Sequence, residues 1–579
     1  MRVKTRGQLM VTRDLRRECF WLVVASLLVT MALRWPSTYH ETGIDSIYIH
    51  GLSNSIVQSG DIGWFAHPLS IFGLYPLSYA SGMPVLLSQF ALMSGTTMEL
   101  TILVFSFLAA AIAAVTSFML TLEIRRSPLL AFAVSIIYSA SPLLLYYTEW
   151  TITTRGFFIA LLPLSIWLII KRERLGSSKS DRRMKMILLV ILAVDLVFLA
   201  TVHKAALMVS LFILSYIIAS RVYRTINWDA FQKGYKIGGL KLSRGGLITI
   251  ILIVSIGSSI IIISNYLGWL GIESYEQGFF SDGSNLSMIV NVIASIAATA
   301  GLPIALLFPI GLVYTILIKK KSFVDFFLLI SFLLILPFSG SRTYERLLFP
   351  IIIIIMIFIP IYFIRNKKHR KLFTQIIVVA TIITLPLNFV IVDRYNQWPS
   401  EMAINDGVSI PDHTYMTAIY FQYNFDGEHF TGNNFFIDGR VQAISGSPEL
   451  PTSILSASIS NILIYGIVTP EELDVETRTL EEALAQKGQL FSTHWTIDMI
   501  RDWVSLYLHS PSFKDSSKIL DKYRVSVFIE DARLNGKVID YDWSTLWPKS
   551  SGSSPFIEGV HKETYKIYDN GIEMIWVVK

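Results

Sequence analysis

The sequence predicts a polytopic α-helical membrane protein with a C-terminal extracytoplasmic α+β domain. Hydrophobic residues make up 53% of the 579 residues and charged residues only 16%, whereas soluble proteins average roughly half and a quarter. This excludes an ordinary cytosolic enzyme. The balance of charge changes near Val392, where the apolar runs stop. Residues 1–392 contain 34 Lys and Arg and 17 Asp and Glu, whereas residues 393–579 contain 15 Lys and Arg and 26 Asp and Glu. The basic balance therefore belongs to the membrane part and does not indicate nucleic-acid binding.

Eleven apolar segments are long enough, or nearly long enough, to cross a membrane as helices, which takes about 20 residues. The fifth and sixth are joined by only four residues, which predicts a tight helical hairpin. The eighth is overlong and contains Gly301 and Pro303, which predicts a tilt or a kink. The predicted spans are residues 19–35, 98–122, 128–147, 156–170, 186–200, 205–220, 246–266, 287–318, 323–338, 347–364 and 373–392.

Basic residues gather on alternate loops, and this pattern orients the spans. With a cytoplasmic N-terminus, 29 of the 34 basic residues in 1–392 fall in cytoplasmic loops, as the positive-inside rule requires. The apolar stretch 64–93 is broken by prolines and glycines. We interpret it as an interfacial or re-entrant element within a long first outer loop, residues 36–97, because a span there would place the later basic loops outside. The odd number of spans then predicts an extracytoplasmic domain at 393–579.

That C-terminal region combines helix and strand patterns and is long enough to fold with its own core. A capping-box pattern opens one helix, and apolar residues repeat at helical spacing in another. The triplet Asp569-Asn570-Gly571 is a strong hairpin signal. The predicted elements are helices near 479–488 and 497–508, a strand at 523–529, and hairpin strands at 564–568 and 572–578.

Several chemistries lack their sequence motifs. Cys19 is the only cysteine, so a disulfide in the outer domain and a zinc site built from cysteines are excluded. The sequence contains no P-loop, no GxGxxG that opens a helix and no HExxH motif. ATP hydrolysis and dinucleotide chemistry are therefore unsupported.

The first outer loop carries the acids that could do chemistry. Glu41 and Asp45 are four residues apart, so on a helix they would share a face. A carboxylate at this place could accept a proton from a hydroxyl nucleophile or hold a divalent cation. A helix cap or a solvated loop acid is equally consistent with these residues. For His50 and His67, an ordinary interfacial histidine is the favoured interpretation.

Four of the five cations on the outer side are candidates for binding a phosphate. Arg342 and Arg346, between the ninth and tenth spans, are four residues apart, and guanidinium groups fit phosphate oxygens. We favour phosphate binding here over a membrane anchor. Arg155, and Lys204 beside His203, could complete such a site, although for both an anchor is the favoured role.

The stretch Gly43-Ile44-Asp45-Ser46-Ile47-Tyr48-Ile49-His50 is followed by Ser55-Ile56-Val57-Gln58-Ser59-Gly60 and Tyr75-Pro76. Together with one preceding span, many later spans and an outer C-terminal domain, it resembles the GT-C glycosyltransferases. It is similar to the loop of prokaryotic, polyprenyl-phosphate-dependent members of this family. The resemblance is specific in sequence over roughly forty residues and architectural over the rest of the membrane part.

The resemblance implies roles for these residues. Asp45, with Glu41 nearby, would be the catalytic base or a ligand of a divalent cation, Mg or Mn. Outer basic residues would face the phosphate of a polyprenyl (dolichyl-type) sugar donor, a role that Arg342 and Arg346 match by topological place. The acceptor would be a lipid, a glycan or a protein. The acidic pair frequent in the family is absent, because Ser46 follows Asp45, and so is the WWDYG-type signature of oligosaccharyltransferases. Transfer of a single sugar is therefore favoured over transfer of a whole glycan.

We therefore expect a glycosyltransferase of the cell membrane that acts at its outer face. Two alternatives come from other classes. A lipid-linked glycan transporter or flippase would need a polar path, yet ionisable residues within the spans are nearly limited to Asp195 and Asp325. For Asp195 a structural hydrogen bond is the favoured role. A non-catalytic cell-surface assembly protein would use the outer domain to bind partners.

Overall fold

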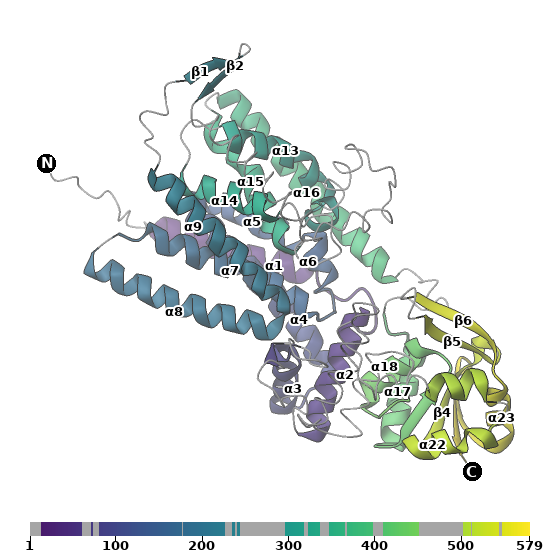
Figure 1. The fold of residues 1–579 in the computed structure, drawn as a ribbon. Coiled ribbons are helices and arrows are strands. Elements are labelled where there is room, and N and C mark those ends of the chain that lie inside the picture. Colours follow the sequence, from purple (N-terminus) through teal and green to yellow (C-terminus); the bar gives the residue numbers. More distant parts are fainter. Residues whose placement is uncertain are drawn as a thin grey trace.

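The computed structural model joins a bundle of helices to a smaller unit of strands and helices formed by the C-terminal region (Figure 1). The structure describes residues 13–60, 71–72, 80–176, 178–225, 234–237, 240–243, 296–317, 322–335, 347–364, 367–397, 409–450, 502–510, 512–542 and 547–578.

Five helices in these ranges are long and apolar enough to cross a membrane: Met98–Arg125, Thr154–Arg174, Lys179–Val202, Ala205–Tyr223 and Lys368–Val392. The chain is thus a multi-pass membrane protein. The count of eleven spans stays a prediction, since the seventh, residues 246–266, lies outside the described residues. The bundle contains α1 (Arg13–Ala32), α4 (Met98–Arg125), α5 (Pro128–Ser139), α6 (Pro142–Tyr146), α7 (Thr154–Arg174), α8 (Lys179–Val202), α9 (Val209–Thr225), α13 (Leu302–Leu317), α14 (Phe323–Ile335), α15 (Phe349–Phe363) and α16 (Lys367–Gln397).

Two predicted spans are interrupted. The span expected at 128–147 is divided into α5 and α6, because Ser141 is extended (φ −62°, ψ 143°) before Pro142, as steric contact with a following proline requires. In the predicted span 287–318, Gly301 has φ +105° and separates a helical segment at 296–300 from α13. The predicted kink is thus a complete break.

A proline within α7 is compensated by a neighbouring helix. Pro163 has no N–H, so the carbonyl of Ile159, four residues earlier, loses its helical partner. The buried Tyr138 hydroxyl of α5 donates to this carbonyl at 2.6 Å. A backbone group freed in a membrane helix must be satisfied by a neighbour, and Tyr138 does this here.

We expect Tyr138→Phe to destabilise the protein by about 0.5–1.5 kcal/mol, the usual range for a hydrogen bond between membrane helices. In a Pro163→Ala background the cost should fall, because the alanine N–H then reaches Ile159. Thermal unfolding of the parent, the two single variants and the double variant in detergent forms a cycle that measures this coupling. Equal costs in both backgrounds would contradict the assignment.

Asp195 in α8 is held by a helix neighbour. The Ser165 hydroxyl of α7 donates to its Oδ2 at 2.5 Å, and the residue is buried. A structural hydrogen bond was the favoured interpretation for this acid, and the structure contains one. Helix α8 otherwise shows mostly exposed apolar side chains, which suits a helix at the edge of a membrane bundle.

The C-terminal unit is built on a four-stranded sheet of order β3-β4-β8-β7, in which β3 and β4 are parallel and the other pairs antiparallel. The predicted hairpin is formed by β7 and β8. The predicted strand at 523–529 corresponds to β4, while the expected helix at 479–488 lies outside the described residues. The elements are α17 (Asp412–Asn424), β3 (His429–Gly432), α18 (Phe435–Ser445), α22 (Ser517–Tyr523), β4 (Val525–Asp531), β5 (Lys537–Asp542), β6 (Trp547–Ser553), α23 (Pro555–Glu563), β7 (Thr564–Asp569) and β8 (Glu573–Val578).

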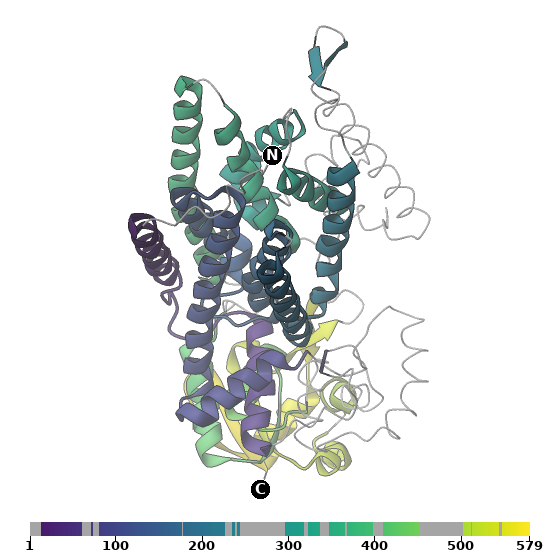
Figure 2. The same cartoon turned by 90° about the vertical axis from the view of Figure 1, so that its left-hand side faces the viewer.

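Helix α2 (Ile44–Ser59) of the first predicted outer loop lies beside this unit, and α3 (Gly82–Ser94) packs on α2 (Figure 1 and Figure 2). Asn54 Nδ2 of α2 donates to the carbonyl of Ala443 at 2.7 Å, and Gln58 Nε2 donates to that of Ser445 at 3.0 Å. Helix α2 is therefore fastened to the end of α18. Of the predicted element at 64–93, residues 82–93 belong to α3, and residues 61–70 and 73–79 lie outside the described part.

Candidate functional site

Asp45 and Arg155 form an ion pair where α2 and α7 begin. Arg155 Nη1 lies 3.1 Å from Asp45 Oδ2. The side chain of Arg155 keeps 30% of its surface exposed, and that of Asp45 keeps 42%. The structure thus brings together a carboxylate and a guanidinium group that are 110 positions apart in the sequence. The sequence predicted these two residues as separate candidates. Both remain accessible to a ligand.

The start of α2 is positioned by close backbone packing. Gly43 precedes the helix with φ +89°, and a Cβ there would lie 2.7 Å from Thr151 Oγ1. Only glycine accepts this combination of conformation and contact readily. The Ser46 hydroxyl accepts a hydrogen bond from the Ile152 N–H at 2.8 Å. These contacts fix Asp45, in the first turn, against the segment that leads into α7.

The start of α7 is equally constrained. The Thr153 side chain caps the helix by accepting from the Gly156 N–H at 2.9 Å. Gly156 lies so close to the carbonyl of Tyr147 that a Cβ would be 2.6 Å from it. Arg155 extends over the Tyr147 ring, with Cζ 5.7 Å from the ring centre, and donates to its hydroxyl at 3.4 Å. The guanidinium is therefore oriented by a ring as well as by Asp45.

Glu41 does not share a helix face with Asp45, so that expectation is wrong. The helix begins only after Gly43, and Glu41 lies before it in a buried position. Its Oε2 is 2.7 Å from Nδ1 of the buried His50. The backbone carbonyl of Glu41 accepts from the Ile410 N–H at 3.0 Å. Glu41 and His50 therefore form a buried pair, and the backbone of Glu41 connects the first loop to the C-terminal region.

The sequence did not single out His40, which joins three parts of the chain. Its Nδ1 is 3.0 Å from Glu99 Oε1 at the start of α4, and its Nε2 is 3.4 Å from Asp412 Oδ1 at the start of α17. The ring stacks on Tyr415 at 4.0 Å. Burial, and then the charge of Glu99, raise the pKa of the Tyr415 hydroxyl. No local spacing could have revealed these contacts, because the partners are far apart in sequence.

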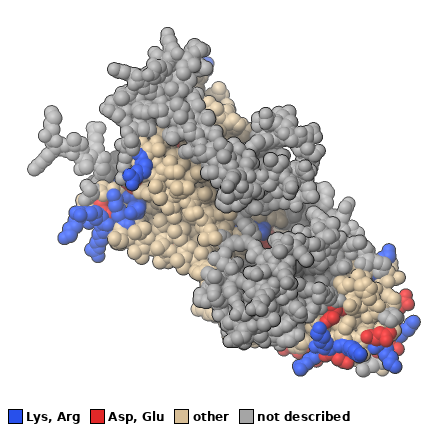
Figure 3. All heavy atoms as spheres, viewed as in Figure 1, with Lys and Arg blue, Asp and Glu red and all other residues tan. Residues whose placement is uncertain are grey.

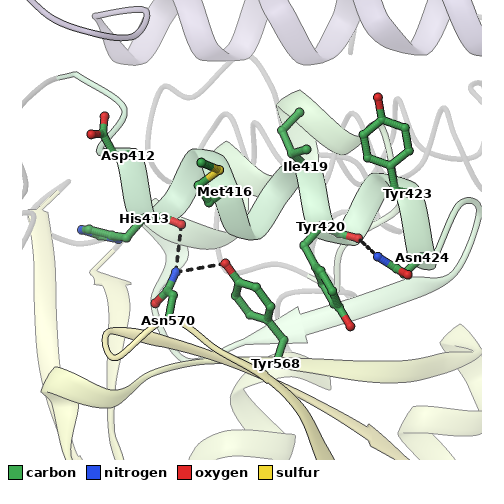
Figure 4. A pocket seen from close by; sticks show the side chains of 9 residues that line it. All are labelled: Asp412, His413, Met416, Ile419, Tyr420, Tyr423, Asn424, Tyr568 and Asn570. Carbon is green, nitrogen blue, oxygen red and sulfur yellow. Dashed lines mark hydrogen bonds between the residues drawn. The ribbon is translucent and has the colours of Figure 1, made fainter.

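An open hollow of about 620 Å³ lies along α17 beside this junction (Figure 4). It begins at Asp412 and is bounded by Met416, Tyr423 and the hairpin residue Tyr568, among others. Asn570 of the hairpin donates to the His413 carbonyl at 3.1 Å and to the Tyr568 hydroxyl at 3.3 Å, as Figure 4 shows. These contacts hold the hairpin against α17.

The remaining candidates divide into one described side chain and four that are not described. His203 is buried between α8 and the short helix Lys204–Met208, where its Nδ1 accepts from the Ala205 N–H at 2.9 Å. This is a capping contact of the predicted hairpin. The side chain of Lys204 and all of His67, Arg342 and Arg346 lie outside the described residues.

The described ranges contain no group of three or more His, Cys, Asp or Glu side chains that could hold a metal ion. Asp45, the predicted ligand, is instead engaged by a guanidinium group. The described residues around Asp45 therefore do not fit a metal site.

A buried acid lies in the first turn of α18, within the C-terminal unit. Asp438 of α18 is almost fully buried, as are Glu449, Glu573 and Asp531. Burial, followed by the charges of Glu449, Glu573 and Asp531, raises the pKa of Asp438 well above its usual range. The fold accepts the protonated carboxyl of Asp438 and is destabilised by its charged form. The stability that the protonated form allows is fully present below a pH of about 3.9, the pKa of an aspartate in the unfolded chain. It is lost as the pH rises through the higher pKa of the folded state.

Asp438→Asn should remove this penalty, since the amide has the shape of the acid and no charge. At pH 7 to 8 we expect the variant to unfold at least about 2 °C higher than the parent, which corresponds to roughly 1 kcal/mol. The two proteins should converge near pH 4. Thermal unfolding across this range checks the result, with the exposed Asp426→Asn as control. A variant less stable at neutral pH would contradict the assignment.

Several solved structures have a similar fold, although no protein-family model and no curated protein sequence matches the chain. The archaeal oligosaccharyltransferase AglB from Archaeoglobus fulgidus, in complex with an inhibitory peptide and a dolichol-phosphate, is 11% identical, with a TM-score of 0.53 over 93% of this chain and 74% of that chain. The Archaeoglobus fulgidus oligosaccharyltransferase tethered to an acceptor peptide is 12% identical, with a TM-score of 0.53 over 90% and 69%. ArnT from Cupriavidus metallidurans, bound to undecaprenyl phosphate, is 11% identical, with a TM-score of 0.49 over 96% and 97%.

The chain therefore has the fold of GT-C glycosyltransferases over most of its length, at very low sequence identity. This confirms the resemblance that the first outer loop suggested. Identities of 11–12% show the fold alone, so the chemistry must be argued from the residues of this chain.

Proposed function

We propose that this protein is a membrane glycosyltransferase that transfers a sugar from a polyprenyl-phosphate donor to an acceptor at the outer face of the membrane. The observation that carries the proposal is the accessible Asp45–Arg155 pair within a fold shared with AglB. AglB was solved with a dolichol-phosphate, and we extend that class of lipid to this chain. The acceptor is a lipid, a glycan or a protein.

The pair supplies the two functions that the reaction needs. An acceptor hydroxyl attacks the anomeric carbon of the donor while the bond from that carbon to the phosphate oxygen breaks. Asp45 takes the proton of the hydroxyl as general base. Arg155 stabilises the negative charge of the departing polyprenyl phosphate, a role that suits its fixed guanidinium group. The donor phosphate displaces the guanidinium from Asp45 only in part, since Arg155 has five N–H groups.

The orientation follows from charge. The basic end of α7, with Lys171, Arg172 and Arg174, is the opposite end from Arg155. The positive-inside rule places this basic end in the cytoplasm. Asp45 and Arg155 then face the outer side, where a lipid-linked donor supplies activated sugar without a nucleotide.

A transfer assay tests the proposal. The purified full-length protein in lipid nanodiscs is incubated with labelled polyprenyl-phosphate sugars and a membrane extract, and label is scored in lipid, glycan and protein. We expect label in one of these fractions and release of polyprenyl phosphate. In proteoliposomes, movement of the intact donor across the bilayer without transfer would replace the proposal with the transporter alternative.

A further inference from the structure

A cleft opens between α7, α8 and α9 on the side of the bundle that faces lipid. Helix α8 exposes Val190, Val194 and Val197 by 56%, 64% and 58%, which indicates contact with acyl chains. The cleft has a volume of about 330 Å³, within the range of small-molecule sites. Its walls are apolar apart from Arg172 and Tyr216; the other lining residues are Ile169, Leu189, Leu192, Ala193, Leu196, Ile213 and Ile217.

Arg172 is a half-buried cation in this apolar wall. Its Nε is buried and has no hydrogen-bond partner within the described residues. Its neighbours are engaged elsewhere: Lys171 and Arg174 both pair with Glu123. A buried guanidinium nitrogen without a partner is costly. An anionic ligand in the cleft would remove that cost.

The surroundings of the cleft attract anions that lie in the membrane. Lys and Arg side chains gather where α7 ends and α8 begins (Figure 3). Lys179, Arg182 and Arg183 of α8 are exposed there. Each basic residue near a bilayer surface contributes to the attraction of anionic lipid headgroups. The Tyr216 hydroxyl donates to Glu173 at 2.7 Å, so polar groups are also present at this basic end of α7.

We propose that the cleft between α7, α8 and α9 binds an anionic phospholipid, with its phosphate on Arg172 and one acyl chain between α8 and α9. The occupant has to be amphipathic, because one wall group is cationic and the rest are apolar. It comes from the leaflet that faces the basic end of the bundle. This site is at the opposite end of α7 from Arg155, so it is separate from the proposed reaction and does not depend on it.

Native mass spectrometry of the full-length protein in detergent tests the site. Phosphatidylglycerol is titrated, with phosphatidylcholine as the neutral control. We expect Arg172→Met to weaken phosphatidylglycerol binding about tenfold, the loss of one charge-assisted hydrogen bond. Arg172→Lys should retain part of the affinity. Lys514→Met, at an exposed position of the C-terminal unit, should bind like the parent, as a control that also removes one positive charge.

A second variant tests the acyl-chain part. Ala193→Trp fills the cleft and should lower phosphatidylglycerol binding while Arg172 is intact, and thermal unfolding verifies that each variant is folded. Equal binding of the two lipids, or unchanged binding by Arg172→Met, would overturn the proposal. Displacement of phosphatidylglycerol by polyprenyl phosphate at lower concentration would assign the cleft to the polyprenyl lipid instead.

Discussion

Asp45→Asn is expected to lower the rate of sugar transfer by about 10²- to 10⁴-fold, the usual contribution of a general base. Asparagine has the same shape and can still accept a hydrogen bond from Arg155, but it cannot take the proton of the acceptor hydroxyl. The loss should appear in kcat, with little change in the affinity for the donor. The variant should fold normally, because a pair that is 30% and 42% exposed contributes little to stability.

The measurement is single-turnover transfer from a labelled donor, together with the unfolding temperature of each variant. Asp426→Asn is the matched control, since Asp426 is an exposed acid of the C-terminal unit. Transfer by Asp45→Asn at the parental rate would show that Asp45 is not the general base, even if the glycosyltransferase fold is confirmed.

Arg155→Met is expected to lower transfer about 10²- to 10³-fold, as found when one group that stabilises a developing negative charge is removed. The donor KM should rise as well, because the same guanidinium binds the phosphate in the ground state. Arg155→Lys should recover part of the rate, since an ammonium retains the charge but not the planar fork. Lys514→Met, at an exposed position, is the control.

Exchange of the two residues separates chemistry from structure. The double variant Asp45→Arg with Arg155→Asp can rebuild an ion pair, but it places the base and the phosphate-binding group on the wrong elements. We expect this variant to fold and to remain inactive. Restored transfer would mean that the pair acts only by holding α2 to α7.

The sequence located Asp45 and Arg155 but could not pair them. Charged side chains are scarce in the outer loops, so each of the two was conspicuous, and the resemblance added weight to Asp45. Their contact depends on the packing of segments 110 positions apart, for which a single sequence has no signal. Glu41 was misplaced for a local reason: a helix was assumed through Gly43, whose positive φ delays the start of α2.

In the C-terminal unit, local sequence patterns predicted secondary-structure elements better than they predicted which polar side chains are buried. The triplet Asp569-Asn570-Gly571 places β7 and β8 correctly because a tight turn is encoded by adjacent residues. The burial of Asp438 among other acids had no such signal. Hydrophobic patterning predicts which apolar residues are inside, and it places acids at the surface unless a partner is known.

The hydrogen bonds from α2 to α18 also govern when the site is completed during synthesis. Asn54 contacts the carbonyls of Ala443 and Ile444, which are 389 and 390 residues later in the chain. At about 5–20 residues per second, a ribosome needs roughly 20 to 80 s to make that stretch. Helix α2 therefore leaves the ribosome roughly 20 to 80 s before its later neighbour does, and during that time its contacts with α18 are missing. The chain thus becomes capable of the proposed reaction last, after the membrane part has been inserted.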